Sequence, residues 1–307
     1  MSSLAKSLSG VHRVCSDPPL RLVGGRTGTS VSLDAVALSF ADKRGELRVL
    51  ESTSLHIRAG EFVCLVGPSG CGKSTVLNLI AGLLTPTTGQ LLANDRPIVA
   101  PSPKRAMVFQ DAALFPWLTL RSNIEYPLRL KNVGQGEREA RSEELLRLVH
   151  LWRFADHYPH ELSGGMRQRG AIARALATDP EVLLMDEPFA ALDAQTREIL
   201  HAEVERIHTL FRKTFVFVTH NVREAVRLAD RIVLMGTRPG RILHEAVVDL
   251  PRPRPTNDAR MNELANDIAG LIAGEVEKVA KEEADDAWVA PANGVRIDSR
   301  RHMGRGV

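Results

Sequence analysis

A short apolar run in the first third of the chain leads directly into a glycine-rich loop. EFVCLV at 61–66 is followed at once by GPSGCGKS at 67–74. A run of this length predicts a buried strand, and the loop fits the pattern G-x-x-x-x-G-K-[ST] between a strand and a helix. Apolar residues continue at helical spacing after the loop, at Val76, Leu77, Leu79, Ile80, Leu83 and Leu84. This order of elements predicts an α/β core with a phosphate-binding loop, which a glycine turn with an incidental lysine does not explain.

Each residue type in the loop suits the binding of a nucleotide. Glycines let the backbone curl so that successive N–H groups face a phosphate. Lys73 is placed for the β- and γ-phosphates, Ser74 offers its hydroxyl to Mg²⁺, and Thr75 supports the helix start. Cys71 is either a small filler, which we favour, or an alkylation target beside the nucleotide. The expected nucleotide contacts in the loop are Gly67, Pro68, Ser69, Gly70, Cys71, Gly72, Lys73, Ser74 and Thr75.

A second apolar run, Val182–Met185, ends in two adjacent acids. This pattern predicts a buried parallel strand that carries carboxylates to its carboxyl end, where open α/β sheets bind ligands. We expect Asp186 to coordinate Mg²⁺ directly or through water, and Glu187 to orient or deprotonate an attacking water. The alternative, that the acids merely end a strand, leaves two buried charges without the counter-charge that Mg²⁺ and Lys73 would supply.

A turn of small residues, Ser163-Gly164-Gly165, precedes a helical pattern at Arg167–Ala177. Free backbone N–H groups and the helix dipole both favour an anion at such a helix start. The same segment therefore predicts a second phosphate-binding element shortly before the acidic strand end.

The remaining pattern divides the chain into segments. Residues 1–30 are rich in Ser, Gly, Pro and Arg without periodicity, which predicts a flexible extension. Alternating apolar residues at Val36–Phe40 and Leu55–Ile57 predict two antiparallel strands, and residues 112–178 predict a mostly helical insertion. Beyond it the α/β pattern resumes, with strands expected at 182–185, 215–219 and 231–235 and helices at 194–211 and 222–229.

The C-terminal part has a different character. PRPRP at 251–255 predicts a stiff linker, and apolar spacing over 258–283 predicts an amphipathic helix. This helix could dock on its own domain, which we favour, on a second copy or on a regulator. The final twenty residues predict disorder. We therefore expect a nucleotide-binding domain at 31–255 and a helical extension with a disordered tail at 256–307.

Composition excludes several classes of protein. A net charge of +3 and 5% aromatic residues argue against a dedicated nucleic-acid surface. No run approaches the ~18–20 apolar residues that span a bilayer, and the first 30 residues lack the apolar core of a signal peptide. The odd cysteine count, with Cys15, Cys64 and Cys71 in no metal-binding pattern, predicts a reduced, cytosolic chain.

The ordered set of motifs resembles the nucleotide-binding subunit of an ABC transporter over about residues 31–250. That set is the phosphate-binding loop, Gln110, LSGGMRQR at 162–169, VLLMDEP at 182–188, Ala191-Leu192-Asp193 and His220. The resemblance implies an ABC ATPase fold: a P-loop NTPase core with an antiparallel β subdomain and an inserted α-helical subdomain. It also implies ATP and Mg²⁺ as cofactors, with each ATP held between two copies of the chain.

The resemblance assigns roles to residues outside the phosphate-binding loop. Phe40 stands where the family places an aromatic ring against adenine, although a core strand aromatic is nearly as good an interpretation. Gln110 should reach Mg²⁺ and the attacking water while linking to the helical insertion. In the family, His220 contacts the γ-phosphate and polarises the water together with Glu187.

Two further motifs are implied to act across the interface between copies. Ser163, Gly164 and Gly165 should contact the γ-phosphate of ATP held by the opposing subunit, and Asp193 should lie at that dimer interface. Hydrolysis would then remove the phosphate that joins the two copies, and the dimer would open.

A dense apolar group follows Gln110 and suggests a partner site. Leu114, Phe115, Trp117 and Leu118 surround Pro116, and a large exposed apolar patch usually marks an interface. The alternative is a locally buried cluster of the insertion. In the family this region receives the coupling helix of the membrane subunit. Phe115-Pro116-Trp117, Thr237–Ile242 and LPRPR at 250–254 resemble the branch that imports nitrate, sulfonates, taurine and related small solutes.

We therefore expect an energy-coupling ATPase of a bacterial importer, peripheral on the cytoplasmic face of the inner membrane. Its partners would be a second copy, integral-membrane permease subunits and, indirectly, a periplasmic or lipid-anchored solute-binding protein, with no nucleic acid. A soluble ABC protein acting on nucleic acid or the ribosome is the alternative, but one motif set and near-neutral charge disfavour it. An inactive clamp is disfavoured by Glu187 and His220, and a fused exporter by the single-domain length.

Overall fold

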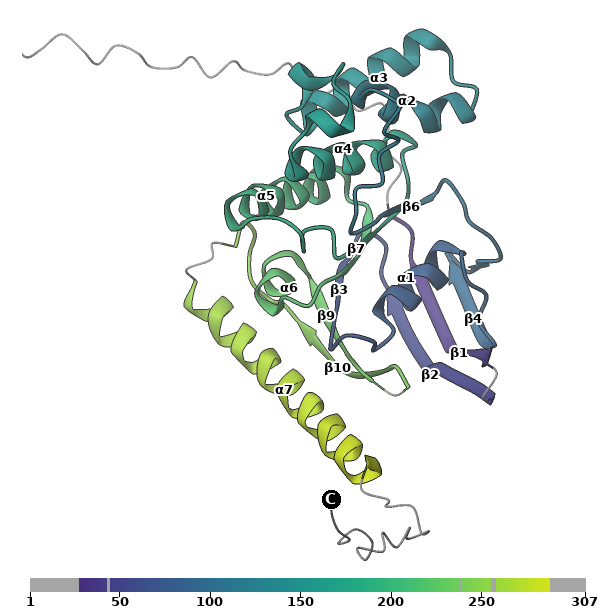
Figure 1. Ribbon diagram of the computed structural model, residues 1–307, viewed down its shortest axis with the longest axis vertical. Coiled ribbons are helices and arrows are strands. Elements are labelled where there is room, and N and C mark those ends of the chain that lie inside the picture. The colour runs from purple at the N-terminus through teal and green to yellow at the C-terminus, as the bar shows by residue number, and fades with distance from the viewer. Residues whose placement is uncertain (1–27, 43–44, 238, 255–257, 288–307) are drawn as a thin grey trace, which may run out of the picture.

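The structure is a computed structural model that describes residues 28–42, 45–237, 239–254 and 258–287 (Figure 1). A six-stranded sheet in the order β10-β9-β3-β8-β7-β6 forms the centre, and its neighbours are parallel except for the antiparallel pair β9 and β10. Its strands are β3 (Phe62–Val66), β6 (Arg105–Val108), β7 (Val182–Asp186), β8 (Thr214–Val218), β9 (Arg231–Gly236) and β10 (Arg241–Val247). All residues of β3 and β8 are buried, because layers cover both faces of the sheet.

One face of this sheet packs against an antiparallel sheet and a helix. The strands β1 (Val31–Asp42), β2 (Gly45–Ile57), β4 (Thr88–Ala93) and β5 (Arg96–Pro97) form a four-stranded sheet in the order β2-β1-β4-β5. Helix α1 (Lys73–Ala81) and the inner face of this sheet share one apolar core with Val63, Leu65, Val216 and Val218 of the central sheet. The two antiparallel strands predicted from alternation are thereby confirmed.

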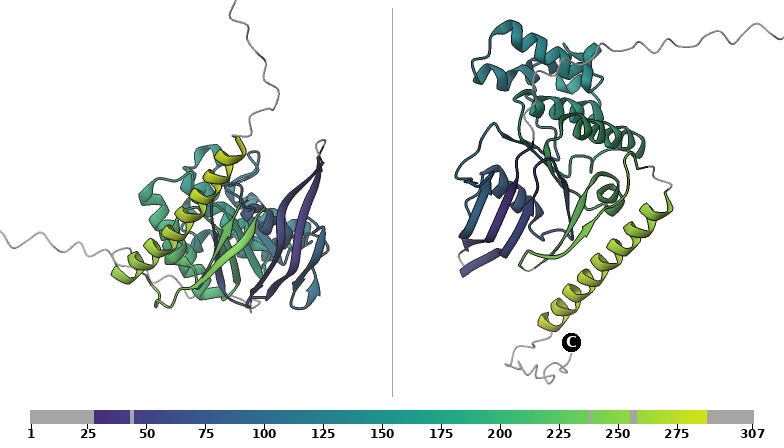
Figure 2. Two further views of the ribbon diagram at one scale, coloured as in Figure 1. Left: turned by 90° about the horizontal axis from the view of Figure 1, so that it is seen from below. Right: turned by 180° about the vertical axis from the view of Figure 1, so that it is seen from behind.

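The opposite face is covered by helices. Phe62, Cys64, Phe215 and Phe217 alternate with the residues above and pack under α5 (Ala194–Phe211) and α6 (Val222–Leu228). In both views of Figure 2 the antiparallel sheet and α7 (Ala259–Ala287) lie on opposite sides of the central sheet. Helices α2 (Leu120–Leu130), α3 (Gln135–Leu148) and α4 (Gly164–Ala177) form the upper end of the molecule in Figure 1.

The helical insertion lies between β6 and β7. Its elements are α2 (Leu120–Leu130), α3 (Gln135–Leu148), the 3-10 turns η1 (Trp152–Phe154) and η2 (Pro159–Glu161), and α4 (Gly164–Ala177), all within 112–178. A Cβ at Gly170 of α4 would come within 2.6 Å of Leu120 Cδ1 on α2. Glycine therefore permits a close approach of the two helices there, in exchange for weaker helix propensity.

Two predictions for the chain ends need correction. The composition of residues 1–30 predicts a flexible extension, but in the structure Gly28 N donates to Arg212 O at 3.0 Å and Thr29 is buried. Residues 251–254 were assigned to a stiff linker, but Arg254 is only 4% exposed. Residues 1–27, 255–257 and 288–307, which include the predicted disordered tail, lie outside the described residues.

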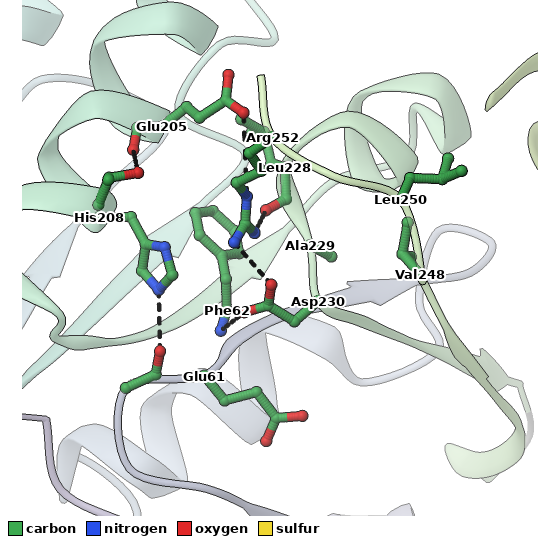
Figure 3. A network of polar contacts seen from close by, with 12 residues as sticks. Glu61, Phe62, Glu205, His208, Leu228, Ala229, Asp230, Val248, Leu250 and Arg252 are labelled. Atoms are coloured by element: carbon green, nitrogen blue, oxygen red, sulfur yellow. Dashed lines mark hydrogen bonds and ion pairs between the residues drawn. The ribbon is translucent and has the colours of Figure 1, made fainter. Parts of the chain in front are cut away.

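The segment after β10 is fixed by arginines (Figure 3). Arg252 lies 2.7 Å from Asp230 Oδ1, donates to the carbonyl of Leu228 and lies over the ring of Phe62. Asp230 also accepts a hydrogen bond from Phe62 N at 2.9 Å. The chain beyond β10 is therefore tied to the beginning of β3 and the end of α6.

The amphipathic helix predicted for 258–283 is confirmed as α7. Met261, Ala265 and Ile268 are buried in the same apolar core as the helices above, and Glu275 Oε1 accepts a hydrogen bond from Arg241 at 3.2 Å. The side chains of Val276 and Val279 lie outside the described part. The first half of α7 thus docks on its own domain, as expected.

Candidate functional site

The phosphate-binding loop connects the end of β3 to the start of α1. Gly72 occupies the N-cap of α1 with φ of 88°, a left-handed conformation that glycine adopts without strain. A Cβ at Gly67 would come within 2.3 Å of Met235 O on β9, so a larger residue would push the loop off the sheet. The sequence pattern therefore corresponds to two backbone positions that require glycine.

Lys73 lies within the curl of this loop. Its buried ammonium donates to Gly67 O and Pro68 O, each at 2.8 Å, and lies 3.6 Å from Cys71 Sγ. Cys71 is fully buried, and burial raises the pKa of its thiol above the usual value. This burial favours the small-filler interpretation of Cys71 over the alkylation target.

Ser74 and Asp186 come together although they are far apart in sequence. Ser74 at the start of α1 donates its hydroxyl to Asp186 Oδ1 at 3.0 Å at the end of β7. Burial raises the pKa of Asp186, with the Ser74 hydrogen bond opposing that shift. A cation at this point would relieve the desolvated carboxylate.

The donors at this point suit Mg²⁺. A hydroxyl and one carboxylate are oxygen ligands, and Mg²⁺ usually binds one or two carboxylates together with phosphate oxygens and water. Among the described residues no group of three or more His, Cys, Asp or Glu could hold a metal by itself.

Glu187 and His220 form a pair at the carboxyl ends of neighbouring strands. Glu187 follows β7, His220 follows β8, and Glu187 Oε2 lies 3.0 Å from His220 Nδ1. Glu187 has φ of 43°, and its N–H donates to Val218 O at 3.0 Å. A positive φ is uncommon for a non-glycine residue. The resemblance gives these two residues a shared role at the attacking water, and the structure places their side chains in contact.

The LSGG segment begins α4, as its pattern predicts. Ser163 is the N-cap of α4, and its side chain accepts a hydrogen bond from Met166 N at 3.3 Å. A Cβ at Gly165 would come within 2.1 Å of Thr196 Cγ2 on α5. Asp193 caps α5 and accepts hydrogen bonds from Thr196 N and Oγ1 at 2.9 and 2.7 Å, which lower the pKa of Asp193. The helix starts of α4 and α5 thus lie together.

Phe40 and Gln110 make no polar contact with the residues above in the described structure. Phe40 is 43% exposed on β1, opposite Leu47 of β2, so the alternative that it is a core aromatic is wrong. Gln110 is exposed in the loop after β6. Gln168 of α4, which sequence reasoning missed, donates from Nε2 to Phe109 O at 3.1 Å and ties this loop to the insertion. Its signal in the sequence is a polar residue on the apolar face of α4.

The predicted apolar group is partly buried and partly exposed. Leu114 is buried, whereas Trp117 is 70% exposed beside Phe115, whose ring centroid lies 5.5 Å away. Tyr126, which the sequence did not single out, adds a ring 4.8 Å from Phe115. Asn123 holds the loop by accepting from Phe115 N at 2.8 Å and donating to Phe115 O at 3.1 Å. Trp117 and Tyr126, which are exposed, and Phe115, which is half-buried, together form one aromatic surface.

The site has a phosphate-binding loop, a Ser–Asp oxygen pair and an acid at the carboxyl ends of parallel strands. These features together define a P-loop nucleoside triphosphatase. Comparison with known proteins makes the class specific. Residues 50–190 match the family described as ABC transporter. The chain is 46% identical over 244 residues to the nitrate import ATP-binding protein NrtD of Synechocystis sp., covering 76% of this chain and 92% of that protein.

A second relative and a solved structure agree. The taurine import ATP-binding protein TauB of Burkholderia pseudomallei is 45% identical over 217 residues, 71% of this chain and 84% of that protein. The dimeric post-hydrolysis structure of the ATP-binding cassette MJ0796 with ADP and Pi is 36% identical, with a TM-score of 0.65 over 72% of this chain and all of that chain. The chain belongs to the ATP-binding proteins of ABC transporters, and it is an ATPase with the ABC ATPase fold that resembles the nitrate and taurine import branch.

No helix within the described residues combines the length and apolar character needed to cross a bilayer.

Proposed function

We propose that this chain is the energy-coupling subunit of a bacterial ABC importer for nitrate, a sulfonate such as taurine, or a related small solute. Its identity of 45–46% with nitrate and taurine import proteins is the observation that carries this proposal. The nucleotide-binding domain would comprise residues 31–255 with its helical insertion at 112–178. Residues 28–30, of which Gly28 contacts Arg212, would belong with this domain, and residues 1–27 and 256–307 would be additions to it.

The residues of one copy would bind and position ATP. Phe40 would stack on adenine, and the loop from Gly67 to Thr75 would surround the phosphates. Lys73, now hydrogen-bonded to two loop carbonyls, would turn its ammonium to the β- and γ-phosphates. Ser74, Asp186 and Gln110 would hold Mg²⁺, which neutralises phosphate charge in the transition state.

Hydrolysis would depend on the Glu187–His220 pair. Glu187 would accept a proton from the attacking water, and His220 would fix that water and the γ-phosphate. The 3.0 Å contact between the two side chains supports this assignment, because positioning supplies most of the catalysis in phosphoryl transfer.

The site would be completed by a second copy. Ser163, Gly164 and Gly165 of that copy would offer the N-terminus of α4 to the γ-phosphate, and Asp193 would lie at the interface. Two observations support this assignment: no hydrogen bond or ion pair among the described residues links these residues to the phosphate-binding loop of the same chain, and the MJ0796 cassette is dimeric.

The membrane partner would dock on the aromatic surface of Phe115, Trp117 and Tyr126. The chain would lie on the cytoplasmic face of the inner membrane, bound to permease subunits and linked indirectly to a solute-binding protein. The alternative, a soluble ABC ATPase acting on nucleic acid or the ribosome, is disfavoured by the net charge of +3.

The first experiment tests the ATP-dependent dimer. Glu187→Gln keeps the shape of the side chain and removes the base, so with Mg-ATP it should accumulate as a dimer in light scattering, whereas with ADP it should stay monomeric. Lys73→Ala is the control that should not dimerise with either nucleotide. A Glu187→Gln chain that binds ATP and remains monomeric would contradict the trans role of Ser163–Gly165. Hydrolysis at the wild-type rate would contradict the role of Glu187.

A second experiment separates import from the alternative. A photo-cross-linking amino acid, p-benzoylphenylalanine, in place of Trp117 should capture an integral-membrane protein in intact cells. The same cross-linker at Val99, an exposed position at 84% on the antiparallel sheet side, serves as the matched control and should not. Cross-links from position 117 that appear in ribosomes or on nucleic acid would favour the alternative.

A further inference from the structure

A buried chain of polar side chains lies directly behind His220. Thr219 directly follows β8 and donates its hydroxyl to Glu224 Oε2 on α6. The other carboxylate oxygen, Glu224 Oε1, accepts from His201 Nε2 on α5 at 2.6 Å. These three side chains are 2%, 6% and 4% exposed. None of them belongs to the motifs that suggested the ATPase.

The Thr219 hydroxyl links the two residues that flank His220. Besides donating to Glu224, it accepts a hydrogen bond from Asn221 N at 3.0 Å. Asn221 is in turn the N-cap of α6, and its side chain accepts from Arg223 N and Glu224 N. His220 is therefore held between two neighbours that share one buried hydroxyl, and this sets the direction in which its ring leaves the strand.

The same cluster contacts the loop that carries Glu187. The ring of His201 packs edge-on against Phe189, with 5.4 Å between centroids, and Phe189 is buried two residues after Glu187. The Glu187 backbone is also bonded to Val218, the residue before Thr219. One buried cluster thus supports both members of the pair that lies 3.0 Å apart.

The buried Glu224 depends on its two hydrogen-bond partners in this cluster. A buried carboxylate is costly unless hydrogen bonds satisfy it, and Glu224 has Thr219 and His201 as partners. The other side of His201 faces Glu198, whose Oε1 lies 3.7 Å from Nδ1, and Glu198 itself pairs with Arg227. Loss of either partner of Glu224 would leave a buried acceptor unpaired and free the His220 loop to move.

We propose that Thr219, Glu224 and His201 are positioning residues for ATP hydrolysis, which act by holding His220 in reach of Glu187. This inference rests on the proposed roles of Glu187 and His220. It predicts that breaking the cluster slows the chemical step and leaves ATP binding intact, because no member of the cluster lies among the expected nucleotide contacts.

A double-mutant cycle tests the proposal in the full chain. Thr219→Val keeps the shape and removes the hydroxyl, so it should lower the single-turnover rate of Mg-ATP hydrolysis about 10- to 100-fold with KM for ATP within twofold of wild type. In a His220→Ala background the same change should add less than a twofold loss, because the residue that it positions is gone. Thr219→Ser should restore the rate. Thr53→Val is the matched control, a buried threonine whose hydroxyl bonds a local carbonyl, and should hydrolyse ATP as wild type does.

Two outcomes would overturn the proposal. One is a wild-type rate in Thr219→Val, and the other is an equal additional loss in the His220→Ala background, which would mean that Thr219 acts independently of His220. If Thr219→Val does not fold, Glu224→Gln replaces it in the same cycle with the same expectations.

A measurement without nucleotide separates this inference from the proposed function. Long-range ¹H–¹⁵N spectra of the histidine rings, with His220 assigned from the His220→Ala spectrum, should show His220 Nδ1 hydrogen-bonded in wild type and in Thr53→Val. Thr219→Val should change that signal. An unchanged His220 signal would refute the positioning role even if ATP hydrolysis failed for another reason. A changed signal in a chain that does not hydrolyse ATP would support the positioning and contradict the proposed function alone.

Discussion

Arg254 should be among the most sensitive single positions for stability, although it lies far from the motifs. Its guanidinium is 4% exposed and donates to five carbonyls. These acceptors are Val226 O at 2.9 Å, Arg227 O at 3.2 Å, Val248 O at 3.2 Å, Leu250 O at 3.0 Å and the carbonyl of Ala229. Three of them belong to the end of α6, where a helix leaves its last carbonyls without intrahelical donors.

The magnitude follows from what Arg254→Ala would leave behind. A buried acceptor without a partner costs about 1–3 kcal/mol, and the bonds to Val226, Ala229 and Val248 are buried. Water entering the vacated space would satisfy part of this set. We therefore expect a loss of about 3–4 kcal/mol in the free energy of unfolding. Arg254→Lys should lose about half as much, because an ammonium cannot spread its donors over five acceptors as a planar guanidinium does.

Urea unfolding followed by circular dichroism measures this effect, with the midpoint and the slope fitted together. Arg260→Ala is the matched control, since that arginine is exposed and its only ion pair within the described residues, with Asp258, is 3.9 Å long. It should change the unfolding free energy by less than about 0.5 kcal/mol. The reasoning is refuted if Arg254→Ala lies within that same range of wild type, or if Arg254→Lys is as stable as wild type.

Three further predictions follow from burial. Burial raises the pKa of Asp186, so the free energy of unfolding falls as pH rises above 3.8, the usual pKa of an aspartate. Asp186→Asn should therefore raise the melting temperature of the nucleotide-free chain at pH 7 and abolish stabilisation by Mg-ATP. A lower melting temperature would contradict this. Burial and, to a lesser extent, the charge of Arg252 lower the pKa of His208 below 6.5, so the free energy of unfolding falls as pH drops below that value. In urea unfolding, His208→Gln should lose less stability than wild type between pH 7.5 and 5.5. An equal loss would exclude His208 as the cause. In a Cys15→Ser background, Ellman's reagent should find no reactive thiol in the native chain and two in urea, because Cys64 and Cys71 are buried; rapid native reaction would contradict this burial.

The arrangement of the candidate site could be predicted because the sequence information that determines it is local. The loop at 67–74 and the acids at 186 and 187 follow apolar strands directly, so the sequence places them at the carboxyl ends of those strands. Parallel strands then bring these ends to one edge of the sheet, where Ser74 contacts Asp186 and Glu187 contacts His220. The apolar face of α7 could also be predicted, because helical spacing of apolar residues is a local pattern.

The contacts that support this edge could not be predicted. Helix propensity alone makes Gly170 an unfavourable residue in α4, and only the fold shows that Leu120 of another helix packs against it. PRPRP looked like a linker, because nothing near Arg254 in sequence shows that the carbonyls of α6 lie around it. In the sequence, Thr219 and Glu224 are polar residues at a strand end and in a helix, and no local pattern indicates that they contact each other.

The sequence by itself determined which chemical groups stand at strand ends and helix starts, since periodicity and glycine motifs are local properties of the chain. Only the tertiary structure decided which buried polar groups satisfy one another, as in the chain from His201 through Glu224 to Thr219. The physical reason is that a buried donor must find an acceptor wherever the fold brings one, and that pairing depends on distances between elements that no local pattern encodes.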